Sequence, residues 1–223
     1  MAMANRGSVA QGLIAHPEAG LERPELERPG LAGRTLWVGT RLLAACTLFY
    51  FLGFVFADVY LKTLNTNGAW RTTDEKPSVL IGTVVLLLVV AAVGAFTAGT
   101  RSFAASRFGA WRLGAGAALA LGLAAVVVQV VQLFFLDFGY GDSGYASVFA
   151  GWQWSLVVAL LFGFYAVATL LAQSVRVPPE TRLHVPDLTS PAALVPTAEA
   201  VRYMLVVLAA VELLAWVLLY LVR

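Results

Sequence analysis

Four polar side chains stand inside apolar stretches of the sequence, and they are the residues best placed to do chemistry there. Gln129 and Gln132 lie three residues apart in the uncharged segment VVVQVVQLFF, a spacing that puts both amides on one face of a helix. Gln153 and Glu212 stand in two later apolar stretches. A buried amide or carboxyl group without hydrogen-bond partners is costly in free energy. We therefore expect the three glutamines to form hydrogen bonds between helices, or to contact a partner or lipid.

Glu212 has two interpretations. A carboxyl group at membrane depth is commonly functional, so Glu212 could relay protons or couple an ion. Alternatively, it is protonated and hydrogen-bonded across helices, for example to one of the glutamines. The second interpretation is favoured because no intramembrane base or second carboxylate accompanies Glu212. Trp216 lies one turn further along and shares the same helix face, so both side chains are candidates for contacts with a partner or with lipid.

A heme, copper or two-metal site inside the membrane would need histidine or thiolate ligands there. The two histidines, His16 and His184, stand outside the apolar stretches, and Cys46 is the only cysteine. The sequence also contains no Gly-rich phosphate loop and no Ser/His/Asp set. We therefore predict that this chain has no catalytic residues, no metal site and no cofactor of its own. This disfavours a membrane enzyme in its own right.

Composition predicts the elements that hold these residues. The chain has 223 residues, of which 60% are hydrophobic and 13% charged, whereas a soluble domain is about 25% charged. Apolar stretches of roughly 20 residues or more recur along the chain, and each is long enough to cross a bilayer as a helix. The sequence therefore predicts an all-α membrane protein, a bundle of five transmembrane helices. These are expected at residues 37–61, 78–99, 112–136, 148–175 and 200–222.

Two regions and an orientation follow from the remaining residues. Residues 1–36 are rich in Pro, Arg and Glu, including LERPELERPG, and predict a flexible cytoplasmic arm. Residues 37–223 form the transmembrane domain. Basic residues gather before the first helix and in the second and fourth loops, which the positive-inside rule places in the cytoplasm. They are Arg6, Arg23, Arg28, Arg34, Arg41, Arg101, Arg107, Arg112, Arg176 and Arg182. The N-terminus is then cytoplasmic and the C-terminus outside.

Small residues follow one face of the third predicted helix. Gly114, Ala118 and Gly122 stand at positions i, i+4 and i+8 of that helix. Small side chains at this spacing let a second helix approach closely in a membrane. The stripe predicts tight helix packing rather than catalysis.

The segment LAAVVVQVVQLFFLDFGYGDSGYASVFAGWQW resembles the signature region of subunit III of heme–copper oxidases. Gln129 matches a glutamine of that signature, Gln132 takes the place of a glutamate, and Gln153 stands where the family has its first histidine. Thr47 stands in place of the family's carbodiimide-reactive glutamate, and Leu156 in place of its second histidine. The resemblance therefore implies the family's fold and partnership, but not a role that depends on its acid.

Three further segments resemble the same family in the same order along the chain. They are AACTLFYFLGFVFADVY, Gly68-Ala69-Trp70 and the final AWVLLY, which contains Trp216 and Tyr220. The likeness covers the chain from about Leu36 onward. The predicted number of helices matches the short, five-helix bacterial form of the family.

The resemblance implies a non-catalytic accessory subunit of a terminal oxidase in the bacterial plasma membrane. Its partners would be the catalytic subunit I, which holds the hemes and copper, and subunit II. The chain would bind phospholipids and stabilise the catalytic subunit during aerobic electron transport, and it would bind no nucleic acid. Close alternatives are the homologous subunit of a quinol oxidase or of a nitric oxide reductase. A small secondary transporter is a further alternative, which the absence of mirrored halves and of paired broken helices disfavours.

Overall fold

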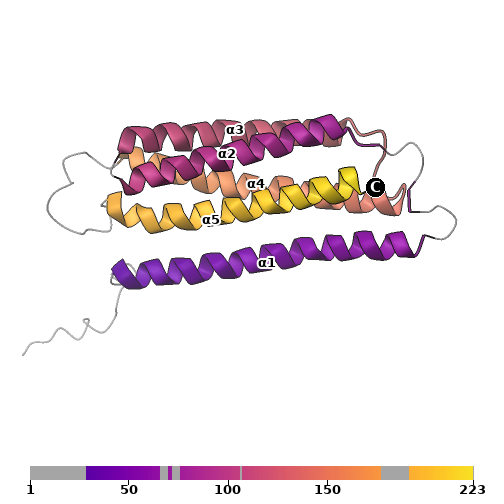
Figure 1. Ribbon diagram of the computed structural model, residues 1–223, viewed down its shortest axis with the longest axis horizontal. Coiled ribbons are helices and arrows are strands. Elements are labelled where there is room, and N and C mark those ends of the chain that lie inside the picture. Colours follow the sequence, from indigo (N-terminus) through magenta and orange to yellow (C-terminus); the bar gives the residue numbers. More distant parts are fainter. Residues whose placement is uncertain (1–28, 66–69, 72–75, 106, 177–190, 223) are drawn as a thin grey trace, which may run out of the picture.

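In the computed structural model, residues 29–65, 70–71, 76–105, 107–176 and 191–222 are described, and this part of the chain is helical with no strand (Figure 1). Its long helices are α1 (Pro29–Thr63), α2 (Val79–Ala104), α3 (Phe108–Phe134), α4 (Gly144–Arg176) and α5 (Pro191–Trp216). A short π-helical segment, η4 (Val217–Leu221), continues α5. The five long helices are all long and apolar enough to cross a membrane. The predicted all-α membrane protein with five transmembrane helices is confirmed.

The helices extend beyond the apolar stretches that predicted them. α1 begins at Pro29, inside the segment expected to be an arm as far as residue 36, and proline is well tolerated at the first position of a helix. α2 continues to Ala104, α4 begins at Gly144, and α5 begins at Pro191. Hydropathy marks only the part of a helix that must be apolar to cross a bilayer, so it underestimates helices that continue into polar ends.

Four of the helices form a square bundle. α2 packs against α3, α3 against α4, α4 against α5, and α5 against α2, so α3 and α5 face each other across the diagonal. Helix α1 packs on the outside of this square, against α5 and α4, and Figure 1 shows it at one edge of the molecule. We call helices α2 to α5 the four-helix square.

The α2–α3 pair has the closest backbone contact of the square. A Cβ atom on Gly114 would lie 2.7 Å from Gly99 Cα and 2.9 Å from Ala95 O. The two backbones touch here because neither glycine has a side chain to hold them apart. Ala118, one turn along α3, is fully buried. Further on, Gly122 makes room for an aromatic ring, since a Cβ atom there would lie 2.1 Å from Phe164 Cζ of α4.

Helix α1 is attached to the square by its C-terminal half. The rings of Phe51 and Phe54 lie 5.8 Å and 5.9 Å from the ring of Trp152 of α4. The Tyr50 and Ser155 hydroxyl groups are 2.8 Å apart and share a hydrogen bond. At the end of the helix, Lys62 Nζ donates to Val222 O at 2.6 Å. Aromatic packing and two hydrogen bonds therefore hold this half of α1 in place.

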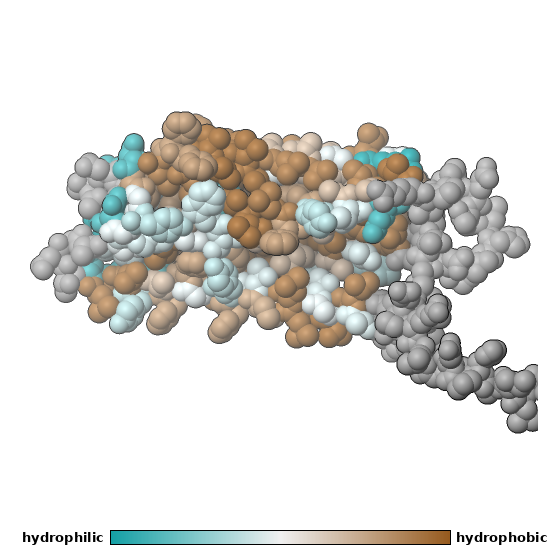
Figure 2. Space-filling model, turned by 180° about the vertical axis from the view of Figure 1, so that it is seen from behind, coloured by the Kyte–Doolittle hydropathy of each residue, from teal (hydrophilic) through white to brown (hydrophobic). Residues whose placement is uncertain are grey.

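The distribution of apolar and hydrophilic residues over the surface suits a protein in a bilayer. Figure 2 shows apolar residues over the middle of the molecule and hydrophilic ones near its two ends. Large apolar side chains are exposed along every long helix, for instance Phe49, Leu87, Leu113, Phe162 and Val206. These side chains suit a lipid environment, because an apolar side chain that faces hydrocarbon has no unfavourable solvation free energy. The chain is a multi-pass membrane protein.

Candidate functional site

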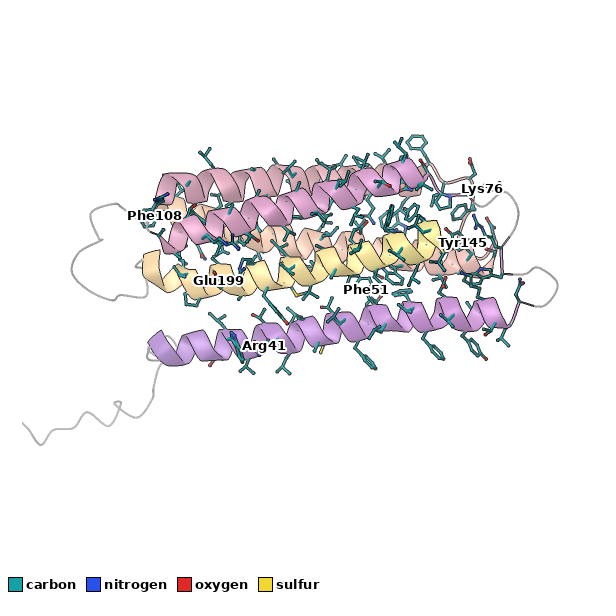
Figure 3. All side chains as sticks on the ribbon, in the orientation of Figure 1. Arg41, Phe51, Lys76, Phe108, Tyr145 and Glu199 are labelled. Atoms are coloured by element: carbon teal, nitrogen blue, oxygen red, sulfur yellow. The ribbon has the colours of Figure 1, made fainter. Side chains whose placement is uncertain are left out.

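The two ends of the bundle carry different groups. Figure 3 shows Arg41, Phe108 and Glu199 at one end, and Lys76 and Tyr145 at the other. The interior between these ends holds the polar residues that the sequence singled out. We call Gln129, Gln132, Gln153 and Glu212 the interior polar set; all four are buried.

Gln129 and Gln153 join α3 to α4. Gln129 Nε2 donates a hydrogen bond to Gln153 Oε1, and each residue is only 2% exposed. Gln129 Oε1 is buried and has no hydrogen-bond partner among the described residues. The amide pair therefore links α3 to α4 along one side of the four-helix square. The Gln129 Oε1 acceptor does not take part in this link.

Gln132 joins three helices at the Lys76 end. Its Oε1 accepts a hydrogen bond from Tyr220 Oη at 3.2 Å, and its Nε2 donates to Ser78 O at 3.4 Å. The Tyr220 ring also fills the space left by Gly82 of α2 and lies 5.6 Å from the ring of Phe149 of α4. Tyr220 thus occupies the centre of the square, in contact with all three neighbouring helices.

Glu212 and Trp216 lie four residues apart on α5, and Tyr220 follows in the π-helical segment η4. Trp216 is half-buried and its Nε1 donates to Thr83 Oγ1 of α2 at 3.0 Å, so its polar contact lies within the bundle. Because residues four apart in an α-helix share a face, Glu212 lies on the same side of α5 as Trp216.

Glu212 is the acid at the centre of this arrangement. Its side chain is 2% exposed, and Oε2 has no hydrogen-bond partner among the described residues. The other buried polar or charged residues described are Asp58, Thr100, Gln129, Gln132, Ser143, Gln153 and Ser174. None of these is a base, so no positive charge compensates a Glu212 carboxylate in the described interior. We expect the carboxyl group to be neutral.

Asp58 is a second buried acid, for which no role was predicted. It lies on α1 with a relative exposure of 3%, one turn before Lys62. The sequence does indicate Asp58 as unusual, because a charged residue there interrupts an otherwise apolar helix. Its burial depends on how α1 packs, which hydropathy alone does not reveal.

An apolar groove lies between the N-terminal half of α1 and helices α4 and α5, beside the buried Ala44. It has a volume of about 490 Å³ and is lined by apolar and small residues of the three helices. They are Leu36, Thr40, Leu43, Thr47, Ala159, Phe162, Gly163, Ala166, Thr197, Ala200, Val201 and Met204. Tyr50, Phe51 and Trp154 line a hollow of about 640 Å³ that shares Thr47 and Phe162 with it. We call the two together the α1 groove.

The opposite end of the α1 groove has a charged mouth of about 320 Å³, formed by Trp37, Arg41, Glu199, Arg202 and Tyr203 among others. The Arg41 guanidinium lies 3.4 Å from the centre of the Trp37 ring. Arg202 Nε donates to Glu199 Oε2 at 2.8 Å, and this pair is partly exposed. A long apolar groove with cationic and aromatic groups at its mouth has the polarity pattern of an amphiphile-binding surface.

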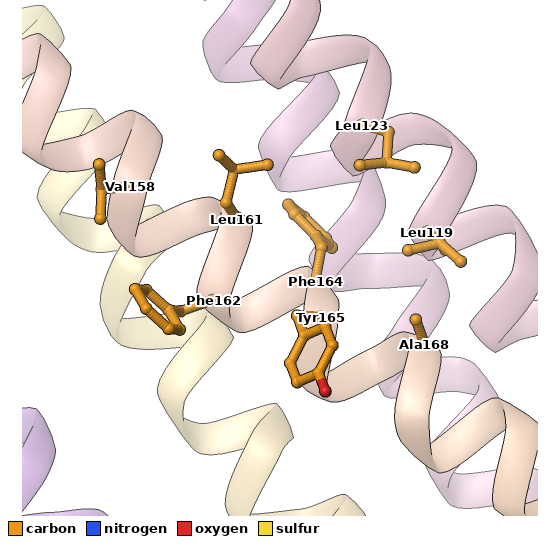
Figure 4. Close-up of a pocket in the computed structure, with 8 residues that line it drawn as sticks. All are labelled: Leu119, Leu123, Val158, Leu161, Phe162, Phe164, Tyr165 and Ala168. Carbon is orange, nitrogen blue, oxygen red and sulfur yellow. The ribbon is translucent and has the colours of Figure 1, made fainter.

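A second groove of about 630 Å³ lies on the outside of the α3–α4 pair. Figure 4 shows Leu119 and Leu123 of α3 beside the aromatic side chains Phe164 and Tyr165 of α4. Its lining is apolar apart from the Tyr165 hydroxyl group. It offers packing surface but no group that could carry out a reaction.

No group of three His, Cys, Asp or Glu side chains that could hold a metal ion occurs among the residues that the structure describes. The two histidines considered as ligands, His16 and His184, lie outside the described residues. Cys46 is an exposed free cysteine on α1, beside the α1 groove. The described interior therefore offers hydrogen bonding and two separate buried acids, Glu212 and Asp58, and no group of three metal ligands.

Comparison with protein-family models finds no match for this chain, and comparison with curated proteins finds none either. The features of this chain that bear on its function are the sequence motifs, the interior polar set and the α1 groove.

Proposed function

We propose that this chain is a non-catalytic accessory subunit, similar to subunit III, of a heme–copper terminal oxidase in the bacterial plasma membrane. The observation that carries the proposal is that the motif segments, far apart along the chain, contact one another. Tyr145 N donates to Trp70 O at 2.8 Å, and Phe149 packs on Tyr220. Phe51 packs on Trp152 in the same half of the bundle. The residues that match the oxidase motifs lie together in the structure. Such a cluster supports common descent with that family better than matches scattered over the molecule would.

The α1 groove supports the lipid-binding part of the proposal. An acyl chain fits its apolar length, and the Arg41 guanidinium at the mouth suits the phosphate of a phospholipid headgroup, whereas Arg202 beside it is paired with Glu199. The hemes and copper would belong to catalytic subunit I, with subunit II as a second partner. The role of this chain would be to hold lipid and to stabilise the catalytic subunit.

Purification tests the partnership. The tagged chain, extracted in mild detergent from its native membrane, should bring down a heme-containing subunit, and the complex should show heme absorbance bands. The same chain expressed alone should show no heme bands, because both histidines of the sequence stand outside its apolar stretches. A chain that purifies alone as a stable oligomer with transport activity would contradict the proposal and favour the transporter.

Cysteine labelling tests the proposed orientation, with the N-terminus in the cytoplasm and the C-terminus outside. In a Cys46→Ala background, we expect Tyr140→Cys to react with an impermeant maleimide in intact cells, since Tyr140 is exposed in the α3–α4 loop. Ala105→Cys, exposed between α2 and α3, should react only after the cells are permeabilised. The physical reason is the cluster Arg101, Arg107 and Arg112, which favours the cytoplasmic side. The reverse labelling pattern would refute this orientation.

A further inference from the structure

We propose that the hollow between α1 and α4 is the docking surface for a transmembrane helix of a partner subunit, which donates a side-chain hydrogen bond to it near the middle of the bilayer. This hollow is the part of the α1 groove with a volume of about 640 Å³, and we call it the α1–α4 hollow. The proposal rests on the proposed function for the identity of the partner. Its physical basis is the depth, the exposure and the hydrogen bonds of Thr47, Tyr50 and Ser155, which line the hollow.

Tyr50 lies near the middle of the membrane. Arg41 and Lys62 are 21 residues apart on α1, which corresponds to about 31 Å of helix and matches a hydrocarbon core of about 30 Å. Tyr50 is nine residues from Arg41 and twelve from Lys62, so it lies about 13 Å and about 18 Å from these two levels. Tyrosine ordinarily lies at the membrane interface, where its hydroxyl group reaches headgroups or water. At the depth of Tyr50, any polar partner of the hydroxyl group must come from protein.

The hollow is open toward the bilayer. Only residues of α1 and α4 line it, and no other described helix covers it. The Tyr50 side chain is 54% exposed, and Val158 and Phe162 on the opposite wall are 50% and 72% exposed. The hollow is therefore a surface of the molecule at which a mid-depth tyrosine remains uncovered by its own chain.

The hydroxyl groups of the hollow can still accept hydrogen bonds but have no proton left to donate. Ser155 Oγ donates its single proton to Gly151 O at 2.7 Å, so Tyr50 is the donor in the 2.8 Å bond between Tyr50 and Ser155. Thr47 Oγ1 donates to Leu43 O at 2.9 Å. Tyr50 Oη and Thr47 Oγ1 accept no hydrogen bond from the described residues, and each keeps its lone pairs. A complementary occupant is apolar and carries a hydrogen-bond donor.

A transmembrane helix provides such a donor at this depth, whereas a lipid does not. An acyl chain has no donor, and a phospholipid carries its polar groups at the interface, more than about 10 Å away. Helices in membranes associate by close packing and by hydrogen bonds between side chains. Cys46 at the edge of the hollow is small, and a Cβ atom on Gly53 of the same helix meets no atom within 4 Å, so a partner helix can approach α1 closely. The part of the α1 groove that α5 also lines stays available to an acyl chain.

The first test is photochemical cross-linking of the full-length chain in its native membrane. Benzoylphenylalanine replaces Val158, which lines the hollow, or Leu87, which is 62% exposed on α2 and lies outside it. The Val158 probe should cross-link to one transmembrane segment of another polypeptide, identified by mass spectrometry. That segment should contain a side-chain donor, such as a hydroxyl, amide or indole group. The Leu87 probe should not give this product.

The second test removes the acceptors and measures the dissociation constant of the purified complex by dilution in mild detergent. Thr47→Val keeps the shape of the side chain and breaks no hydrogen bond between helices of this chain. Tyr50→Phe keeps the ring, and the unfolding midpoint of this variant, measured alongside, reports the loss of its bond to Ser155. At least one of the two variants should raise the dissociation constant about threefold, the factor that corresponds to an interhelical hydrogen bond of about 0.6 kcal/mol.

Thr40→Val is the matched control for Thr47→Val. Thr40 Oγ1 also donates to the carbonyl group four residues earlier, Leu36 O at 2.7 Å, but Thr40 lies outside the hollow. This variant should leave the dissociation constant unchanged. Dissociation constants for Thr47→Val and Tyr50→Phe that both equal the Thr40→Val value would overturn the proposal.

The cross-linking result separates this proposal from the proposed function. Products from Val158 that contain only lipid, or a second copy of this chain, would overturn the docking surface, as would equal yields from Val158 and Leu87. A heme-containing subunit that purifies with the chain but is not cross-linked from Val158 would support the proposed function and overturn the docking surface. A cross-linked helix from a complex without heme would support the docking surface and contradict the proposed function.

Discussion

Replacing Gly114 with alanine should destabilise the bundle by about 1–3 kcal/mol, the range for overpacking a tightly packed position. The added methyl group would lie 2.7 Å from Gly99 Cα and 2.9 Å from Ala95 O, closer than van der Waals contact allows. Both atoms belong to the α2 backbone, so no side-chain rotation can relieve the clash. Helices α2 and α3 must move apart, and the contacts along their length weaken together. Unfolding of the purified chain in detergent, followed by circular dichroism, measures the effect.

Gly116→Ala is the matched control for Gly114→Ala. A Cβ atom on Gly116 meets no atom within 4 Å, and the residue lies on the same helix two positions away. Alanine favours a helix over glycine by about 1 kcal/mol, so this variant should be as stable as the wild type or more stable. Equal losses in the two variants would mean that the close α2–α3 contact contributes no specific stability.

Truncating Trp152 to alanine should cost about 3 kcal/mol, the lower end of the range for a buried tryptophan in a soluble core. The lower end applies because the Trp152 indole N–H is buried without a partner among the described residues, so truncation also removes an unsatisfied donor. Trp152 is fully buried and its ring packs on both Phe51 and Phe54. The variant should therefore loosen α1 more than it loosens the square. A fluorescent label at Cys46, which is exposed on α1, should report increased mobility.

Trp154→Ala provides the comparison for this effect on the same helix. Trp154 is only partly buried and lines the α1 groove, but its ring packs on Phe134 of α3, whereas the Trp152 ring packs on Phe51 and Phe54 of α1. Its truncation should leave the mobility of the Cys46 label near the wild-type value and lower the stability by clearly less. A label that responds equally to both variants would show that the Trp152 cluster is not what attaches α1.

The helices were predictable because a bilayer imposes a simple requirement. A backbone that crosses hydrocarbon must satisfy its own hydrogen bonds, and the side chains facing lipid must be apolar, so hydropathy alone marks each helix. The helix ends were less predictable, as Pro29 and Ala104 show, because polar turns continue a helix without any hydropathy signal.

The interior contacts were only partly predictable. The spacing of Gln129 and Gln132 predicted a common helix face, but it did not predict that Gln129 bonds to α4 while Gln132 bonds to Tyr220 and to Ser78. Both faces of a transmembrane helix are apolar, so sequence periodicity does not say which neighbour a polar residue meets. The central place of Tyr220 follows from Gly82, whose missing side chain makes room for the ring.

The two halves of helix α1 differ in how they meet the rest of the bundle. The Trp152 cluster and the hydrogen bond from Lys62 to Val222 O hold its C-terminal half. Its N-terminal half buries Ala44 and otherwise borders the α1 groove, with Arg41 and Trp37 at the mouth. Because residues of α1, α4 and α5 line the groove together, an acyl chain in it would contact three helices at once and add to the packing between them.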